Sequence, residues 1–354
     1  MKPILPTITG IGSVTPFGPL AGLIPHAPLE QPPLEPGPIT AWTTDGLRRA
    51  FVVKPFQPAS VVPGLKTRRL DRLSAWTLVA SSLALQDAKI DLSQMDRSRV
   101  AVVFATGFGC IELTESFYRS AATNGWSGTD PITFPETLAN SPPGHVALFH
   151  GLRGPNITIS NRFFAGECAL LQAASLLRHG QADMAVVIAG DTLTQTMYAW
   201  YETAGLLSPA CYNAQPLTEP FGYVPSEGVV ALVLEPAANR DVRSYGHLHA
   251  GRWATGGDPL ESIYQMLGDS VPSLTIAAGN GGPCSSGPAN HPAGGIFSAE
   301  AAIVPAQPVA LGLTDTGALF HLVLALSKRD CRGNALMLAT SGDRGFAALL
   351  LELP

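Results

Sequence analysis

Short, almost continuously apolar runs alternate along the chain with stretches whose apolar residues recur at helical spacing. Helical spacing predicts helices over Ser74 to Ala88 and Gly166 to His179, the second followed by Gly180 as a C-cap. This alternation is typical of α/β folds, in which helices cover parallel strands. We expect strands at Val100 to Ala105, Asn156 to Ser160, Met184 to Ala189, Val229 to Glu235, Ala335 to Ala339 and Ala347 to Leu353. Because most of these runs are largely apolar, we expect most of the strands to be buried on both faces.

Two stretches break this pattern and are expected to be loops. Residues Pro19 to Thr40 are rich in proline, and Gly279 to Gly295 read GNGGPCSSGPANHPAGG without any period. A further break, PAANRDVRSYG, follows the strand that ends at Glu235. We therefore expect two α/β halves, residues 1–240 and a shorter 241–354.

The composition of the chain excludes several classes of protein. With 46% apolar and 14% charged residues, the chain can bury a large core. Its net charge of -5 and its lack of basic runs argue against nucleic-acid binding. Five widely spaced cysteines without a C-x-x-C pair argue against disulfides and structural zinc, and we expect neither a metal nor a cofactor. Prolines interrupt the apolar stretch Ile4 to Ile24, so we expect no targeting segment and a cytoplasmic protein.

Several motifs, in order, resemble those of the β-ketoacyl synthases, the condensing enzymes of fatty acid and polyketide assembly. They are ITGIGSVTPFG (Ile8 to Gly18), RRLDRLSAWTLVASSLAL (Arg68 to Leu85), VVFATGFG (Val102 to Gly109), FPETLANSPPGHVALFHGLRGPNITIS (Phe134 to Ser160), ADMAVVIAGD (Ala182 to Asp191), GLLSPA (Gly205 to Ala210) and PFGYVPSEGVVALVLE (Pro220 to Glu235). After residue 240 the resemblance is carried by DTGALFHLVLAL (Asp315 to Leu326) and TSGDRGFAALLLEL (Thr340 to Leu353).

The resemblance implies a thiolase-like fold, in which two similar halves form five αβαβα layers. It also implies a dimer, in which the strand Asn156 to Ser160 pairs with its counterpart across a two-fold axis. Family members use a nucleophilic cysteine at a helix N-terminus and two histidines that hold the thioester oxyanion.

The positions of these catalytic groups are occupied by other residues. Aligning Gly154-Pro155-Asn156 with the family motif places Phe163 at the nucleophile, and a shift of one residue would place Arg162 or Phe164 there. The two histidine positions fall on Ala278 and Thr314, and a family lysine position falls on Val309. A phenyl ring has no thiolate and cannot be acylated.

A family member without a nucleophile resembles the chain-length factors, the inactive partners of active ketosynthases. We therefore expect a non-catalytic subunit that heterodimerises with an active β-ketoacyl-ACP synthase and shapes its acyl tunnel, in a polyketide, aryl-polyene-like or fatty-acid-like pathway. The acyl carrier protein would be reached through this complex. The expected tunnel and interface residues are Phe108, Thr133, Phe134, Asn156, Thr158, Ser160, Phe163 and Phe164.

Two other readings remain open at this point. The chain could be an acyltransferase or hydrolase that uses Cys168 or Ser160 as a relocated nucleophile, although Cys168 would lie about one and a half turns into the helix. Alternatively, it could be a homodimeric binding or scaffold protein. In either case Phe163 and Phe164 are aromatic side chains of the kind that fill a vacated cavity.

Overall fold

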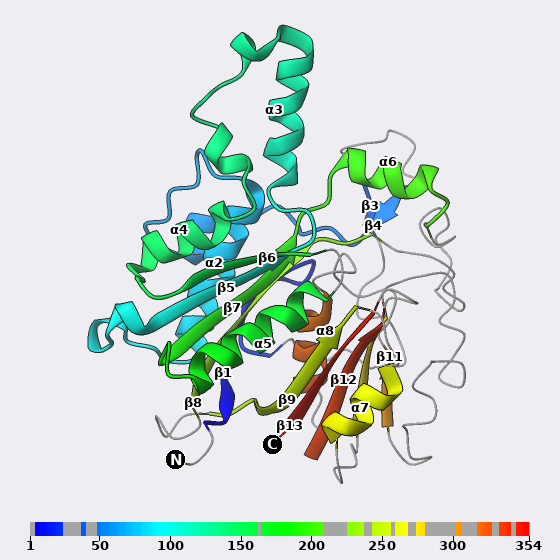
Figure 1. Ribbon diagram of the computed structural model, residues 1–354. Coiled ribbons are helices and arrows are strands. Elements are labelled where there is room, and N and C mark those ends of the chain that lie inside the picture. The colour runs from blue at the N-terminus through cyan, green and yellow to red at the C-terminus, as the bar shows by residue number, and fades with distance from the viewer. Residues whose placement is uncertain are drawn as a thin grey trace.

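The structure is a computed structural model, which describes residues 4–23, 37–39, 48–161, 164–207, 225–236, 243–255, 259–267, 274–279, 302–305, 317–327, 333–340 and 345–353. Figure 1 shows one large twisted sheet with helices on its outer faces and helices α5 and α8 between its two parts. The helix α3 projects away from this body.

The sheet has the strand order β6-β5-β7-β8-β1-β9-β13-β12-β10-β11, with β2 paired to β1. Strands β5, β6 and β7 are parallel to one another, as are β10, β11 and β12, and all other pairs in the sheet are antiparallel. A separate two-stranded sheet pairs β3 with β4. The strand bounds are β1 Pro6–Thr15, β2 Gly18–Ala21, β3 Gly37–Pro38, β4 Arg49–Ala50, β5 Val100–Thr106, β6 Asn156–Ser160, β7 Met184–Asp191, β8 Gly228–Pro236, β9 Gly246–Ala254, β10 Leu274–Gly279, β11 Ala302–Pro305, β12 Gly333–Thr340 and β13 Phe346–Leu353.

The helices complete five layers. Helices α2 and α4 cover the outer face of the β6-to-β1 half, α5 and α8 lie between the halves, and α7 covers the outer face of the β9-to-β11 half. The described helices are α1 Pro58–Val61, α2 Arg72–Asp87, α3 Ile111–Asn124, α4 Ser141–His150, α5 Ala165–Arg178, α6 Gln195–Thr203, α7 Pro259–Leu267 and α8 Gly317–Leu326, with short 3-10 turns η1 Leu92–Gln94, η2 Arg97–Arg99, η3 Trp126–Gly128 and η4 Phe134–Thr137.

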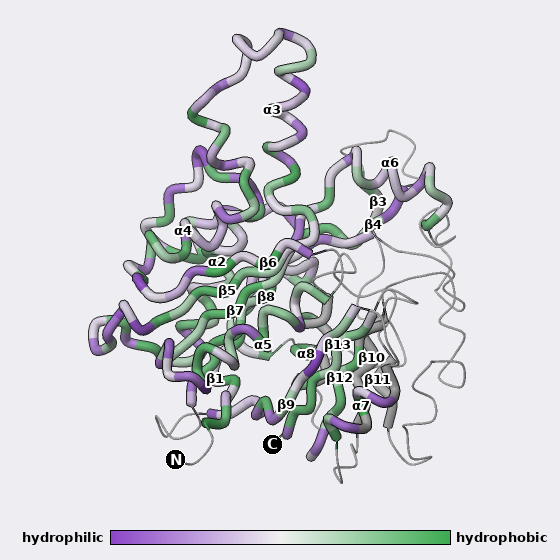
Figure 2. Tube along the Cα trace, viewed as in Figure 1, coloured by the Kyte–Doolittle hydropathy of each residue, from purple (hydrophilic) through white to green (hydrophobic). Residues whose placement is uncertain are grey.

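The hydropathy of the chain explains this layering. Strands β5, β7 and nearly all of β8 are buried on both faces, as expected for strands between two helix layers. Figure 2 shows the largely hydrophobic character of these strands. One apolar cluster joins α5 and α8 to both halves of the sheet, and another joins α2 to the outer face of β5, β7 and β8. Gly12 permits the close approach of α2, since a Cβ there would lie 2.1 Å from the Ala80 carbonyl oxygen.

The two halves repeat one topology. In each half a central strand lies between two strands parallel to it, and two antiparallel strands come next in the spatial order of the sheet. The strands β5, β6, β7, β8 and β1 of one half therefore correspond, in this order, to β10, β11, β12, β13 and β9 of the other. The halves meet where β1 pairs with β9 at Thr7 and Ile8. The thiolase-like five-layer α/β fold of two similar halves is therefore confirmed. The division at about residue 240 remains our proposal, and it lies between β8 and β9.

The expected elements agree with the structure in most places. All six expected strands and both expected helices are present within a few residues. Gly180 lies one position beyond the C-cap His179 and has a φ of 63°, which explains why a glycine follows this helix. The exception among the strands is β6, which is only partly buried because it ends the described sheet.

The loop expected at Pro19 to Thr40 is wrong in part. Residues Gly18–Ala21 form β2, which pairs with β1 in a hairpin, and Gly37–Pro38 form β3. Proline occurs in such positions because an edge strand leaves some N–H groups without a ladder partner. Residues 24–36, 40 and 280–295 lie outside the described residues. In the described part of the chain, no helix is long and apolar enough to cross a membrane.

Candidate functional site

The candidate site lies where the carboxyl ends of three parallel strands meet. Thr106 at the end of β5 is in register with Ser160 at the end of β6, and Asp191 ends β7 on the other side of β5. In open α/β sheets this edge is the usual place for ligands, because the loops that leave it converge there.

A buried carboxylate fixes the loop that follows β5. Asp191, only 1% exposed, accepts hydrogen bonds from the Thr106 hydroxyl at 2.6 Å, from the Gly107 amide at 3.1 Å and from the Phe108 amide at 3.0 Å. The Thr106 hydroxyl in turn accepts from the Gly109 amide at 2.8 Å. Asp191 therefore holds three consecutive residues directly and Gly109 through Thr106, and this fixes the backbone position of Phe108.

The N-terminus of α5 carries a buried aromatic ring one residue after Phe163, the position at which the nucleophile is expected. Phe164 is the N-cap residue, and its amide oxygen accepts the first helical hydrogen bond from Cys168 N at 2.9 Å. Its φ of 61° is a conformation that bulky L-residues rarely adopt. The side chain is 2% exposed and belongs to the central apolar cluster. Arg162 and Phe163 themselves lie outside the described residues.

The first turn of α5 is electrostatically unfavourable for a thiolate. Glu167 is completely buried, and this burial raises its pKa from 4.5 to about 7. Burial likewise raises the pKa of the Cys168 thiol to about 12, and the neighbouring Glu167 charge adds to the rise. A thiol with such a pKa carries almost no thiolate near neutral pH, so Cys168 has the properties of a packing residue.

The expected interface strand β6 is an edge strand of the described sheet. Asn156 and Ser160 are exposed and Thr158 is half-buried, while the Asn156 amide donates to the Pro143 carbonyl of α4 at 3.1 Å. Within the described residues one side of β6 has no strand beside it.

The expected tunnel residues have different neighbours. Phe108 is half-buried against a cluster that includes Leu193, Met197 and Tyr198 of α6 and the preceding segment. Phe134 is 48% exposed, and its ring lies 5.6 Å from that of Phe117 in α3. Thr133 is half-buried, and its hydroxyl donates to Asp130 at 2.9 Å. The structure therefore places Phe108 beside α6 but Thr133 and Phe134 in the projecting part of the chain.

The histidine positions are only partly described. Ala278 lies in β10, in register with Ala339 of β12, whereas Val309 and Thr314 lie outside the described residues. Five histidines of the described residues have hydrogen-bond partners other than Ser160 and Cys168: His145 contacts Glu136, His150 contacts Ser82, His179 contacts Ser175, His247 contacts Thr7 and His249 contacts Glu352.

Asp191 and Glu167 are two residues of this site that were not predicted from the sequence. Asp191 follows the apolar run AVVIAG directly, and an acid at the end of a buried strand was the available signal. Glu167 stands in an otherwise apolar helix start, AGECALL, where a charge is unusual.

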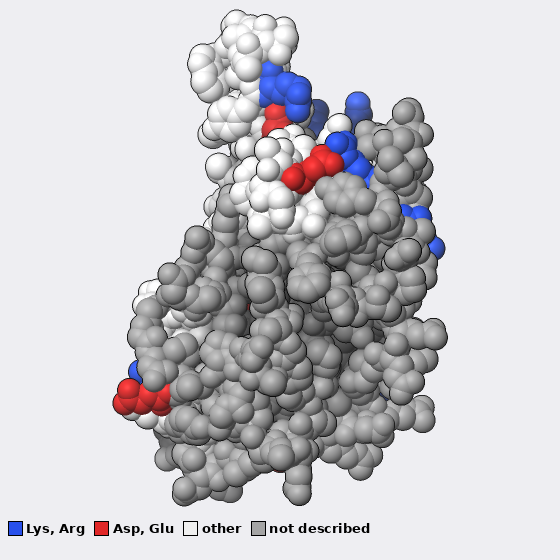
Figure 3. Space-filling model, turned by 90° about the vertical axis from the view of Figure 1, so that its right-hand side faces the viewer, with Lys and Arg blue, Asp and Glu red and all other residues white. Residues whose placement is uncertain are grey.

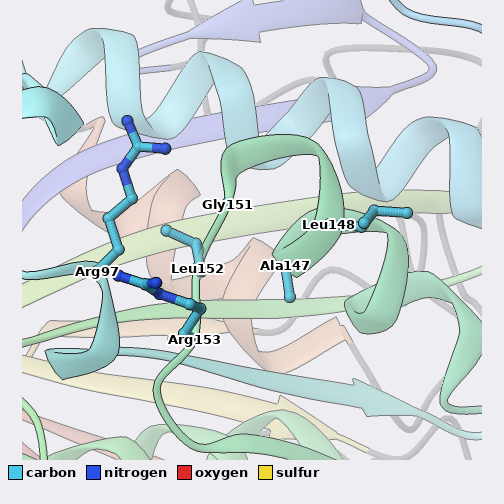
Figure 4. Close-up of a pocket in the computed structure, with 6 residues that line it drawn as sticks. All are labelled: Arg97, Ala147, Leu148, Gly151, Leu152 and Arg153. Carbon is cyan, nitrogen blue, oxygen red and sulfur yellow. The ribbon is translucent and has the colours of Figure 1, made fainter.

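A shallow depression of about 670 Å³ is separate from this site. Its lining residues come from η2, the C-terminal end of α4 and the turn before β6, at the amino ends of the strands (Figure 4). The Arg97 guanidinium there donates to the carbonyls of Leu92 and His150, so it holds the end of α4 in place. The remaining lining residues are Ala147, Leu148, Gly151, Leu152 and Arg153.

Comparison with known proteins gives consistent matches. The sequence model described as "Beta-ketoacyl synthase, N-terminal domain" matches residues 36–240, which is more than half of the chain. The 3-oxoacyl-[acyl-carrier-protein] synthase 2 of Vibrio cholerae serotype O1 is 28% identical over 200 residues, covering 54% of this chain and 48% of that protein. The protein of the same name from Synechocystis sp. is 28% identical over 256 residues, covering 68% and 60%. The matched region thus spans about half to three fifths of these curated relatives.

Three solved structures share the fold over 99% of this chain. The ishigamide ketosynthase/chain length factor gives a TM-score of 0.72 at 22% identity and is covered over 99% of its chain. A type II polyketide acyl carrier protein in complex with its hexaketide-bound ketosynthase gives 0.76 at 17% identity, with that chain covered over 100%. A β-ketoacyl synthase from Burkholderia phymatum gives 0.77 at 16% identity, also covered over 100%. Because the family's sequence model matches more than half of the chain, the protein belongs to the β-ketoacyl synthase family.

Proposed function

We propose that this protein is a non-catalytic ketosynthase-like subunit of the chain-length-factor kind. It pairs with an active β-ketoacyl-ACP synthase and shapes the acyl tunnel of that enzyme, in a polyketide, aryl-polyene-like or fatty-acid-like pathway. What supports this proposal most is the alignment that places Phe163 at the nucleophile position, together with the observation that the ring of the next residue, Phe164, is buried at the N-cap of α5.

The surroundings of α5 support a loss of catalysis rather than a relocated mechanism. A buried carboxyl at Glu167 and a thiol at Cys168 with a pKa near 12 both oppose the formation of a thiolate. Ser160, the other alternative nucleophile, is exposed at the end of β6, and the five histidines with described partners contact other groups. An acyltransferase or hydrolase mechanism through Cys168 or Ser160 is therefore the less favoured alternative.

Similarity to known proteins supports the kind of partner. One solved structure with this fold is a ketosynthase/chain length factor, and another contains a ketosynthase with its acyl carrier protein. The curated relatives are named as synthases, and the family's condensing reaction needs a cysteine that this chain lacks at Phe163. We therefore assign the catalytic cysteine and histidines to the partner.

The residues proposed to serve the tunnel and the interface fall into two groups. Phe108, with Phe163 and Phe164, would close the acyl tunnel from this side. The edge strand and the segment before α4 would contact the partner, through Thr133, Phe134, Asn156, Thr158 and Ser160.

Co-expression tests the proposed function. A tagged chain is produced together with a β-ketoacyl-ACP synthase from the same source organism, and the mass of the purified species is measured by native mass spectrometry. We expect a heterodimer of one copy of each subunit. Recovery of this chain as a catalytically active homodimer would contradict the proposal.

A further inference from the structure

The depression at the amino ends of the strands has a cationic side and an apolar side. In Figure 4 the side chains of Arg97 and Arg153 lie on one side of it, and those of Ala147 and Leu148 lie on the other. Its volume of about 670 Å³ is within the range of small-molecule sites. A ligand that matches both sides carries a negative charge at one end and an apolar body at the other.

The apolar side of the depression is open to solvent. Leu148 is 79% exposed, the largest exposed fraction among the large apolar side chains of the described residues. Ala147, which also lines the depression, is half-buried. A hydrocarbon chain laid over these two residues would remove apolar surface from water, and each methylene group buried in this way tightens binding by about fourfold.

The backbone around the depression is fixed before any ligand binds. The Leu152 amide donates to the Ala147 carbonyl at 2.8 Å, and the Arg153 amide donates to the Arg97 carbonyl at 2.8 Å. Gly151 lets the Arg97 side chain lie across the end of α4, since a Cβ there would lie 2.7 Å from Arg97 Nη1. A site formed in advance loses less conformational freedom on binding, which favours affinity.

The two arginines have N–H groups to spare for a ligand. Arg97 uses two of the five N–H groups of a guanidinium on the carbonyl oxygens of Leu92 and His150. Arg153 is exposed, and its guanidinium has neither a hydrogen-bond partner nor a carboxylate within 4 Å among the described residues.

This lack of an ion pair distinguishes the two residues from other arginines in the described part of the chain. Figure 3 shows basic and acidic groups side by side below the projecting lobe. Three arginines form ion pairs of 2.6 to 2.9 Å: Arg48 with Glu202, Arg72 with Glu112 and Arg99 with Asp183. Arg97 and Arg153 therefore carry positive charge that no described carboxylate neutralises by direct contact.

The acids that interact electrostatically with the two arginines are Asp91 and Asp96. Each of these carboxylates accepts hydrogen bonds from the amide and the hydroxyl of the serine two residues later, at 2.9 and 2.7 Å. Both acids are exposed, so water and salt screen their effect on the arginines. An anion in the depression would meet little competition from them.

We propose that this depression binds an aliphatic anion, which is a carboxylate or phosphate head group on an unbranched hydrocarbon chain. Arg153 and the remaining N–H groups of Arg97 bind the head group, because guanidinium groups hold carboxylate and phosphate oxygens by paired hydrogen bonds. The hydrocarbon chain lies over Ala147 and Leu148. The inference does not depend on the proposed function, since the depression lies at the opposite ends of the strands from the candidate site.

Isothermal titration calorimetry with decanoate and with decyl phosphate tests the proposal. The chain is titrated in the assembly in which it is purified, below the concentrations at which the ligands form micelles, and any ketosynthase partner is titrated alone as the blank. We expect saturable binding, with decanoate binding about fivefold or more tightly than octanoate because it is two methylene groups longer. Binding of only one of the two ten-carbon anions would support the proposal and assign the head group.

Two matched pairs of variants locate the bound ligand. Arg153→Gln should weaken binding by about tenfold or more, and Arg119→Gln, at an exposed arginine of α3, should change it by less than about twofold. Leu148→Gln should also weaken binding, and Ile132→Gln, at a side chain that is 63% exposed, should not. Arg97 is left unchanged because it also holds the end of α4. Circular dichroism verifies that each variant is folded.

Three results would overturn the inference. The first is the absence of saturable binding by both anions. The second is binding that Arg153→Gln leaves unchanged, which would place the ligand elsewhere, for example in an acyl tunnel. The third is equally tight binding of decyltrimethylammonium, a cation with the same hydrocarbon chain. Failure of the chain to pair with a ketosynthase would refute the proposed function and leave this inference standing.

Discussion

Glu167 provides a quantitative test of the electrostatics at the N-terminus of α5. Its carboxyl is completely buried in the first turn of α5, and burial raises the pKa from 4.5 to about 7. At about 1.4 kcal/mol per pKa unit, this rise corresponds to ~3 kcal/mol of folding free energy once the group ionises. Glu167→Gln removes the ionisation but retains the size of the side chain.

The sign of the effect follows from proton binding. Below about pH 4.5 the carboxyl is protonated in both folded and unfolded chains, so its charge does not affect stability. Between about pH 4.5 and 7 the unfolded chain loses this proton first, and the unmodified protein loses stability relative to the variant. Above pH 7 the difference in the free energy of unfolding between Glu167→Gln and the unmodified protein is constant. Relative to its value at pH 4, this difference should have shifted by ~3 kcal/mol in favour of the variant.

Urea unfolding of both proteins, followed at half-unit steps from pH 4 to pH 8.5, measures this difference. Two other groups also make the stability depend on pH in this range, because burial raises the pKa of Asp71 to about 6 and lowers that of His150 to about 4. Both groups are present in the variant and in the unmodified protein, so their contributions cancel in the comparison. Glu261→Gln, at an exposed position of α7, is the matched control. A difference between Glu167→Gln and the unmodified protein that does not vary with pH would refute the assignment of a buried, weakly acidic carboxyl.

Three further predictions concern the site and the dimer. Phe108→Ala should lengthen the products of the heterodimer, measured by mass spectrometry with the partner and carrier protein kept the same. Because the ring is half-buried, the substitution should lower the free energy of unfolding by about 1–3 kcal/mol. An unchanged product length would mean that Phe108 is an ordinary packing residue. Phe163→Cys, tested with the partner's cysteine removed, should show no condensation. Each missing oxyanion donor lowers the rate by ~10²–10³, and neither Ala278 nor Thr314 can act as such a donor. Measurable turnover would contradict the assignment of those two positions. The chain without its partner should aggregate in sedimentation experiments, because β6 leaves backbone groups open at the described sheet edge; a well-behaved monomer would argue against this reason for pairing.

Strands and helices with strong local signals could be predicted from the sequence. The uninterrupted apolar runs around Val100 and Met184 require burial on both faces, and the structure has β5 and β7 there. Elements whose residues have only a weak local preference could not be predicted in this way. The strand β2 contains Pro19 and depends on pairing with β1, a contact that local propensity does not encode.

The candidate site was predictable only where one residue type determines the chemistry. Phe163 has a side chain that cannot form a thiolate, so the proposed loss of the nucleophile rests on the sequence and remains a prediction. The role of Asp191 depends on three hydrogen bonds to a loop 83 to 85 residues earlier in the chain, and the raised pKa of Glu167 depends on complete burial. Both are consequences of packing between distant segments, which the order of residues does not reveal.

The central claim is that this chain takes part in condensation without being acylated. The most direct measurement is intact mass spectrometry of the purified heterodimer after incubation with acyl-carrier-protein thioesters. The claim predicts an acyl adduct on the ketosynthase subunit alone, lost when the partner's cysteine is replaced, with the mass of this chain unchanged. A stoichiometric acyl adduct on this chain, mapped to Cys168 or Ser160, would show that it is a catalyst and contradict the claim.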